Sequence, residues 1–191
     1  LFEHATTFGS LIQVPEELAE KLQALKQLSD VTSQDLFVSE ALKRLGPLVQ
    51  QAELLAAQYD AVVANPPYMG SRLMNPVLKG YARQLYPSPK GDLFAACLVR
   101  LLQYGKPAGQ LGLMTPSTWL SLKSYESLRE ILLETKTLQS LIEPELHAFF
   151  DSAYVSICTF IVRKRHITGY NASFIKLSDF YGAELQPTMT L

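Results

Sequence analysis

Residues 65–68, Asn-Pro-Pro-Tyr, combine a rigid backbone with side chains that suit a planar substrate. Each proline fixes its own φ and lacks a backbone N–H, so the segment is stiff and offers carbonyl oxygens as acceptors. Asn65 adds a side-chain amide, and Tyr68 adds an aromatic ring with a hydroxyl. Acceptors that converge on an exocyclic amino group make its nitrogen more nucleophilic, and preorganised dipoles need no rearrangement during a reaction. The motif therefore predicts catalysis on a planar amine, and a plain turn after a strand is the competing interpretation.

The elements around the motif predict where this site lies. Residues 61–64 form a short apolar run, which is typical of a strand buried on both faces. The two prolines end the ladder of hydrogen bonds, so the chain leaves the sheet at the carboxyl end of the strand. That edge is where open α/β sheets bind ligands. Further strands are expected at residues 109–114, 138–142, 154–162 and 170–177, with helices from Asp92 and over 121–134, which predicts a doubly wound α/β fold.

Residues 1–58 form a helical segment before the strand, and residues 59–191 form the unit that contains the motif. Pro15 is expected to start the first helix, and Ser33 to cap a second one. Gly46-Pro47 is expected to interrupt the second helix, which then resumes over residues 48–58. Residues 71–90 are rich in Gly, Pro and Ser, and we expect a long loop there with one helical turn at most.

The charge distribution favours a nucleic-acid partner. Residues 1–60 carry nine acidic residues against four Lys or Arg, whereas residues 61–91 carry four bases and no acid. Arg72, Lys79 and Arg83 belong to this basic stretch, and tyrosines are interleaved with them. Bases and aromatic rings together are typical of contacts with phosphates and stacked bases, although a solvated loop is the alternative.

The remaining composition excludes several classes of protein. No apolar run is long enough to span a membrane, and no secretory signal peptide is visible. Cys97 and Cys158 form neither a CxxC pair nor a zinc pattern, which favours buried thiols in a reducing cytoplasm. The three histidines are scattered, so we expect no metal site and no membrane partner.

The motif resembles that of amino-group methyltransferases that use S-adenosylmethionine, above all the adenine-N6 DNA methyltransferases. The longer pattern is similar to the PglX methyltransferases of the BREX phage-exclusion systems. This resemblance covers roughly residues 59–165. The segments that carry it follow the four-residue motif: Met69-Gly70-Ser71, Met74-Asn75-Pro76, Leu78-Lys79, Asp92-Leu93-Phe94-Ala95 and Ser124-Tyr125-Glu126-Ser127-Leu128-Arg129.

The resemblance implies a fold, a cofactor and a set of site residues. The strand order would be 3-2-1-4-5-7-6 with an antiparallel seventh strand, and this chain would supply strands 4, 5, 6 and 7 of a class I methyltransferase. Asn65, Pro66, Pro67 and Tyr68 would be catalytic, and Asn65 would also contact S-adenosylmethionine. Phe150, with Phe149 as the fallback, would stack on an adenine flipped out of double-stranded DNA. A core phenylalanine is the competing interpretation of Phe150.

The half that binds the cofactor is expected to be missing. No Gly-rich turn follows a predicted strand, and no acid matches the ribose contact of nucleotide-binding sheets. The chain is therefore expected to be a piece of a longer protein that is inactive by itself. A methyltransferase acting on RNA or on a protein glutamine, and a non-catalytic DNA-binding or interaction module, are the alternatives. Association with other phage-defence proteins is left open.

Overall fold

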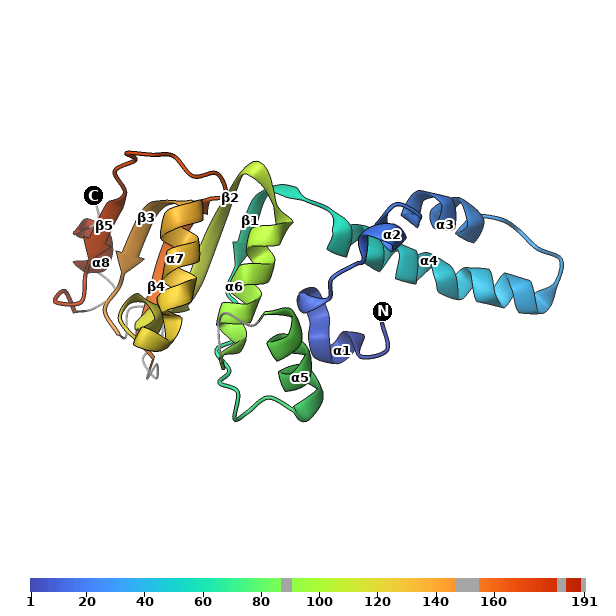
Figure 1. Ribbon diagram of the computed structural model, residues 1–191, viewed down its shortest axis with the longest axis horizontal. Coiled ribbons are helices and arrows are strands. Elements are labelled where there is room, and N and C mark those ends of the chain that lie inside the picture. Colours follow the sequence, from blue (N-terminus) through green and yellow to red (C-terminus); the bar gives the residue numbers. More distant parts are fainter. Residues whose placement is uncertain (87–90, 147–154, 182–184, 190–191) are drawn as a thin grey trace. The chain divides into compact units, whose positions relative to one another are not determined.

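In the computed structural model, which describes residues 1–86, 91–146, 155–181 and 185–189, the chain divides into two units, Leu1–Gln58 and Tyr59–Leu191. The first unit is helical, as predicted. It contains α1 (Ala5–Phe8), a 3₁₀ turn (Gly9–Leu11), α2 (Glu16–Ala19), α3 (Leu22–Ser29) and the long α4 (Leu36–Ala56) (Figure 1). An ion pair of 3.0 Å between Lys26 Nζ and Glu53 Oε2 joins α3 to α4.

Two predicted details of this unit are wrong. Asp35, not Ser33, caps α4, because the Asp35 carboxylate accepts hydrogen bonds from the N–H groups of Phe37 and Val38, at 2.8 and 3.3 Å. The helix also continues through Pro47 instead of stopping at Gly46-Pro47. A proline removes one backbone hydrogen bond from a helix. The turns on both sides remain, and the buried side chains of Val49 and Ala52 hold the second half in place.

The second unit is built on a five-stranded mixed sheet in the order β1-β2-β4-β3-β5. The strands are β1 (Tyr59–Ala64), β2 (Gly105–Pro116), β3 (Thr137–Glu143), β4 (Ile157–Arg163) and β5 (Ser173–Lys176). β1 is parallel to β2, β3 is parallel to β5, and β4 is antiparallel to both of its neighbours. The predicted α/β class is thus confirmed, together with the order 4-5-7-6 and the single reversed strand.

The helices of this unit include one that the sequence did not predict. α5 (Pro76–Leu85) occupies part of the expected loop, because the Asn75 side chain accepts a hydrogen bond from the Leu78 N–H at 2.8 Å and Pro76 fits the first helical position. α6 (Leu93–Tyr104) starts after Asp92 as predicted. α7 (Glu126–Thr135) follows two 3₁₀ turns at Ser117–Leu120 and Lys123–Tyr125, and a short α8 spans Leu185–Thr188.

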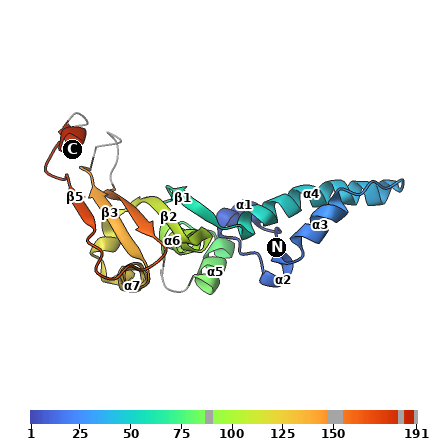
Figure 2. The same ribbon diagram turned by 90° about the horizontal axis from the view of Figure 1, so that it is seen from above.

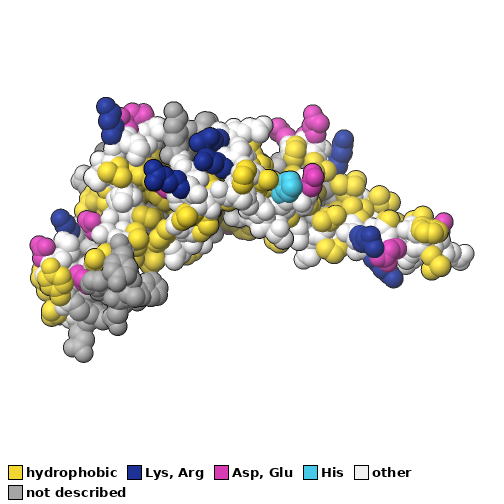
Figure 3. Space-filling view, turned by 90° about the horizontal axis from the view of Figure 1, so that it is seen from below, with side chains coloured by type: hydrophobic (Ala, Val, Ile, Leu, Met, Phe, Trp, Pro, Cys, Tyr) yellow, Lys and Arg dark blue, Asp and Glu magenta, His cyan; other side chains and the backbone are white. Residues whose placement is uncertain are grey.

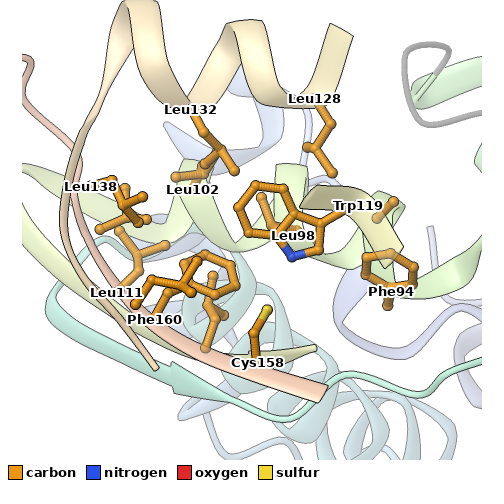
Figure 4. Close-up of a cluster of buried hydrophobic side chains, with 14 of the residues drawn as sticks. Phe94, Leu98, Leu102, Leu111, Trp119, Leu128, Leu132, Leu138, Cys158 and Phe160 are labelled. Carbon is orange, nitrogen blue, oxygen red and sulfur yellow. The ribbon is translucent and has the colours of Figure 1, made fainter. Parts of the chain in front are cut away.

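One face of the sheet carries the hydrophobic core. Figures 1 and 2 show α6 and α7 on this face, and Figure 4 shows α7 side chains pointing toward the strands. Leu98, Leu128 and Leu132 are fully buried there, and the ring of Trp119 lies 5.1 Å from that of Phe160. The opposite face carries exposed apolar side chains such as Val63, which is 85% exposed. β1 and β5 form the two edges of the sheet among the described strands.

Candidate active site

The Asn-Pro-Pro-Tyr motif lies at the carboxyl end of β1, as the two prolines predicted. β1 ends at Ala64, where the pairing Ala64–Leu113 joins it to β2. β2 and β3 end at the same edge, and β4 begins there, because β4 alone runs in the opposite direction. Backbone contacts close this edge: the Ser117 N–H after β2 donates to the Ser156 carbonyl before β4, at 2.9 Å.

Asn65 faces an apolar groove on the uncovered side of the sheet. The groove has a volume of about 450 Å³, and Val63, Met114, Ile142, Thr159 and Ile161 line it together with Asn65. The Asn65 side chain makes no hydrogen bond to any described residue, so its carbonyl and amide are available to a ligand. In the segment that follows, the Pro67 carbonyl accepts a hydrogen bond from the Met69 N–H at 3.1 Å. The Pro66 carbonyl has no partner within the described part of the chain, so it is the second available acceptor.

Tyr68 is held against the start of β4 with its ring partly open to solvent. The residue is 38% exposed, and its hydroxyl has no hydrogen-bond partner in the described residues. Burial raises the pKa of the Tyr68 hydroxyl, and the nearby Cys158 thiol adds to that rise, so the phenol stays neutral at physiological pH. The exposed part of the ring offers a surface on which a flat ligand can stack.

A buried polar network lies beneath Tyr68. The Trp119 Nε1–H donates to Thr115 Oγ1 at 3.0 Å, and Thr115 Oγ1 lies 3.6 Å from Cys158 Sγ. Burial raises the pKa of Cys158, although its hydrogen bonds to Thr115 and Trp119 act in the opposite direction. Arg129 on α7 supports this segment by donating to the carbonyls of Trp119 and Leu122, at 2.7 and 2.8 Å.

The backbone after Tyr68 is tied to the start of α6. The Leu93 N–H donates to the Met69 carbonyl at 2.8 Å, the Ser71 N–H donates to the Gly91 carbonyl, and Gly70 forms a bridge with Asp92. The Asp92 carboxylate in turn accepts a hydrogen bond from the Tyr125 hydroxyl. Asp92 and Tyr125 both belong to segments that resemble the methyltransferase family. Nothing in the sequence around either residue predicted the hydrogen bond between them.

The predicted phosphate-binding side chains lie on and beside α5. Arg72 precedes the helix, and Lys79 and Arg83 stand one turn apart on it, so they share a face. None of the three forms an ion pair with a described residue. Figure 3 views the chain from the side on which α5 lies in Figure 1 and shows Lys and Arg side chains (dark blue) on that surface.

The remaining expectations concern the two phenylalanines of the base pocket, metal ions and membrane spans. Phe149 and Phe150 fall outside the described residues. Within the described ranges no group of three or more His, Cys, Asp or Glu side chains could hold a metal ion. Over the same ranges no helix has both the length and the apolar character needed to cross a membrane.

The residue at the carboxyl end of β1 fits the end of S-adenosylmethionine that carries the methyl group. Asn65 stands beside the apolar groove, where an acceptor could contact the end of the cofactor that carries the methyl group. The described carboxyl ends of β1 and β2 lead into Asn65-Pro66 and Ser117-Thr118, so neither presents a carboxylate for the ribose hydroxyls. No Gly-rich turn follows a strand in the described part of the chain.

Comparison with known proteins identifies the fold and the family of the chain. The fold is that of class I S-adenosylmethionine-dependent methyltransferases. A protein of this description from Listeria monocytogenes superposes on the chain with a TM-score of 0.54 at 15% sequence identity. The superposition covers 99% of this chain and 67% of the Listeria chain. Residues 8–150 match the profile of the Eco57I restriction-modification methylases. The chain therefore belongs to the Eco57I restriction-modification methylase family.

Two curated relatives are more specific. The adenine-specific methyltransferase BrxX of Escherichia coli is 38% identical over 94% of this chain, and PglX of Lacticaseibacillus casei is 31% identical over 70%. The resemblance to PglX that the motifs predicted is thus confirmed. The matched regions make up 15% of BrxX and 11% of PglX, so the chain spans a small part of the length of either relative.

Proposed function

We propose that this chain is the part of an adenine-specific DNA methyltransferase that binds the target base and promotes transfer of a methyl group to its N6 nitrogen. The observation that carries the proposal is a pair of acceptors at the end of β1 that have no partner among the described residues, the Asn65 side-chain carbonyl and the Pro66 carbonyl, with the partly exposed ring of Tyr68 beside them. BrxX and PglX are both adenine-specific methyltransferases, which supports the choice of base.

The roles of the residues follow from their chemistry. The two acceptors take the two N–H bonds of the adenine amino group, which draws its lone pair out of conjugation with the ring and toward the incoming methyl group. Tyr68 stacks on the base and limits its rotation. Because the Tyr68 hydroxyl is neutral and has no partner in the described structure, stacking and not proton transfer is its role. Phe150, or Phe149 in its place, is the proposed second wall of the base pocket.

S-adenosylmethionine supplies the electrophilic methyl group when it is bound. Asn65 is the residue of this chain that would meet it, at the mouth of the groove. The contacts to its ribose and amino-acid parts are assigned to a segment outside this chain, because the described ends of β1 and β2 present no carboxylate and no Gly-rich turn follows a strand in the described residues. We therefore propose that residues 59–191 form the catalytic half of the domain, that residues 1–58 form a helical insertion, and that the chain by itself is inactive.

Double-stranded DNA is the proposed partner of the basic surface formed by Arg72, Lys79 and Arg83. These three cations form no ion pair with a described residue and lie on a segment without acidic residues, so they are suited to phosphate contacts that position the duplex beside the motif. The setting we propose is restriction-modification or phage defence in the cytoplasm, where the two free buried cysteines remain reduced.

The decisive experiment is a methylation assay on the full-length protein from which the chain derives. We expect transfer of labelled methyl groups to adenine in duplex DNA, loss of activity in Asn65→Ala and Tyr68→Ala, and an unchanged circular dichroism spectrum in both variants. RNA and a protein glutamine serve as competing substrates. Preferential labelling of either competitor, or wild-type activity of Asn65→Ala, would refute the proposed function. Calorimetry that detected tight binding of S-adenosylmethionine to the 191-residue chain would refute the assignment of the cofactor contacts elsewhere.

A further inference from the structure

Asp92 occupies the N-cap position of α6 but does not cap it. Aspartate is among the residues preferred at this position, because its carboxylate can accept hydrogen bonds from the first free N–H groups of the helix. In this structure the Asp92 side chain makes no such bond, and it accepts a hydrogen bond from the Tyr125 hydroxyl instead. The Asp92 side chain therefore links the start of α6 to Tyr125 and does not stabilise its own helix by capping.

The two partners of this hydrogen bond come from well-anchored elements. Tyr125 is 5% exposed, and its ring centroid lies 5.6 Å from that of Phe94 on α6. Arg129, one turn into α7, holds the preceding segment through the Trp119 and Leu122 carbonyls. Burial raises the pKa of the Asp92 carboxyl, and the Tyr125 hydroxyl supplies a hydrogen-bond donor to it.

The backbone of Asp92 is in direct contact with the catalytic segment. Residues 91–93 pair with residues 69–71 as a short antiparallel bridge, through the bonds from the N–H groups of Leu93 and Ser71. The pairing is tight: a Cβ atom placed on Gly70 would lie 3.2 Å from Asp92 Oδ1, and Gly91 has a φ of 112°, which favours glycine. Only one residue, Met69, separates this bridge from Tyr68.

We propose that Asp92 and Tyr125 are positioning residues for the methyl transfer, because their hydrogen bond fixes the bridge at Gly70 and through it the orientation of Tyr68 and Asn65. The inference rests on the proposed function and names a further part of the same site. Neither residue touches the base. They act on the geometry of the acceptors, which must hold the amino group within a few tenths of an ångström.

Hydrogen exchange on the 191-residue chain tests the structural half of this proposal without any activity. Tyr125→Phe removes the donor and keeps the ring that packs on Phe94. We expect the amides of Ser71 and Leu93 to exchange at least about tenfold faster in this variant, since a hydrogen bond to a charged group is lost. The core amides of β2 and β4 should keep their protection. Tyr170→Phe removes an exposed hydroxyl elsewhere and is the matched control. Unchanged exchange at both Ser71 and Leu93 would overturn the proposal.

Steady-state kinetics on the full-length protein tests the catalytic half. We expect Tyr125→Phe to lower kcat about tenfold or more with nearly unchanged KM for DNA, because the loss affects the transition state. Asp92→Ala should lower kcat as much as Tyr125→Phe does. Asp92→Asn should keep most of the activity, because its side chain retains an acceptor oxygen. The double variant Asp92→Ala/Tyr125→Phe should lose no more activity than either single variant. Additive losses, or wild-type kcat in Tyr125→Phe, would overturn the positioning role alone. A wild-type protein without adenine methylation would overturn the proposed function, while the exchange experiment would still decide whether the bridge depends on Tyr125.

Discussion

Replacement of Gly109 by alanine is expected to destabilise the larger unit, because β1 and β2 approach each other closely at this glycine. A Cβ atom at Gly109 would lie 2.9 Å from the Tyr59 carbonyl oxygen, 3.0 Å from the Lys106 nitrogen and 3.1 Å from the Asp60 carbonyl oxygen. All three are backbone atoms, and the register of the two strands shifts between Tyr59 and Ala61. The new methyl group therefore has no flexible side chain to displace.

The size of the effect follows from these distances. Ordinary contacts of a Cβ atom begin at 3.4 Å, so Tyr59 would have to move by about half an ångström. Overpacking of this kind costs about 1–3 kcal/mol, and we expect about 2 kcal/mol here. Gly80 is the matched control, because it lies in α5 of the same unit and a Cβ atom there would meet nothing within 4 Å. Since glycine inside a helix is about 0.5–1 kcal/mol less favourable than alanine, Gly80→Ala should stabilise the unit.

Urea unfolding followed by tryptophan fluorescence measures both changes. Trp119 is the single tryptophan of the chain and is 2% exposed in the core of this unit, so its emission reports the unit selectively. With a slope of about 2 kcal/mol per molar urea, Gly109→Ala should lower the midpoint by about 1 M, and Gly80→Ala should raise it by about 0.3 M. A midpoint of Gly109→Ala equal to or above that of the wild type would refute the reasoning, as would a shift of both variants in the same direction.

Three further predictions concern the site and its surroundings. In the full-length protein, the double variant Lys79→Gln/Arg83→Gln should reduce the slope of log K against log salt concentration for duplex DNA by about 2, since each phosphate contact contributes about 0.9. Arg165→Gln, which follows the carboxyl end of β4 and so lies at the other end of the strands from the motif, should leave the slope unchanged. Fluorescence anisotropy over a salt series measures both slopes. Tyr68→Phe should retain methylation within about threefold while Tyr68→Ala loses it, because the ring and not the hydroxyl contacts the base; equal losses in radiolabel assays would contradict the stacking role. Burial raises the pKa of Cys97 to about 11 from 9.0, so the stability that its neutral thiol contributes is present below pH 9 and is lost as the pH rises toward 11. Urea titrations at both ends of this range measure how far the free energy of unfolding falls with pH. The fall should be smaller in Cys97→Ala than in the wild type, by up to about 2 kcal/mol. An identical pH dependence in the variant would show that the thiol is not responsible.

The presence of most strands and the place of the motif were predictable from local signals. The run of apolar residues that ends in Pro66-Pro67 predicts a strand and the place where it stops. The expected burial on both faces is wrong, because β1 is an edge strand of the described sheet and Val63 is 85% exposed. The resemblance supplied what periodicity could not, namely the strand order and the antiparallel direction of β4 between β2 and β3. α5 is not predicted because glycine, proline and serine indicate a loop, although Asn75-Pro76 is a favourable start for a helix.

The remaining parts of the site depend on contacts between distant residues, which no local pattern contains. Asp92 was predicted as the start of a helix, and that is correct for its backbone, but its carboxylate binds Tyr125, which lies far along the chain. The same holds for Cys158, whose position beneath Tyr68 follows from the pairing of β4 with β2. Pro67 was expected to leave its carbonyl free, yet Met69 occupies it through a turn. Residue types predicted the chemistry, and tertiary contacts decided which atoms remain available for it.

The central place of β4 has a consequence for how the chain folds. β2 pairs with β4 through contacts such as Gly112–Ile161, roughly fifty residues apart, and β3 also depends on β4 because it has no contact with β2 in the sheet order. During synthesis β1, β2 and α6 can assemble first, but β3 leaves the ribosome without its central neighbour. Until Ile157–Arg163 arrives, the inner edges of β2 and β3 are unpaired and can join other chains. The strand that closes the sheet is thus made late, and the interval before its arrival is when the nascent protein is most exposed to aggregation.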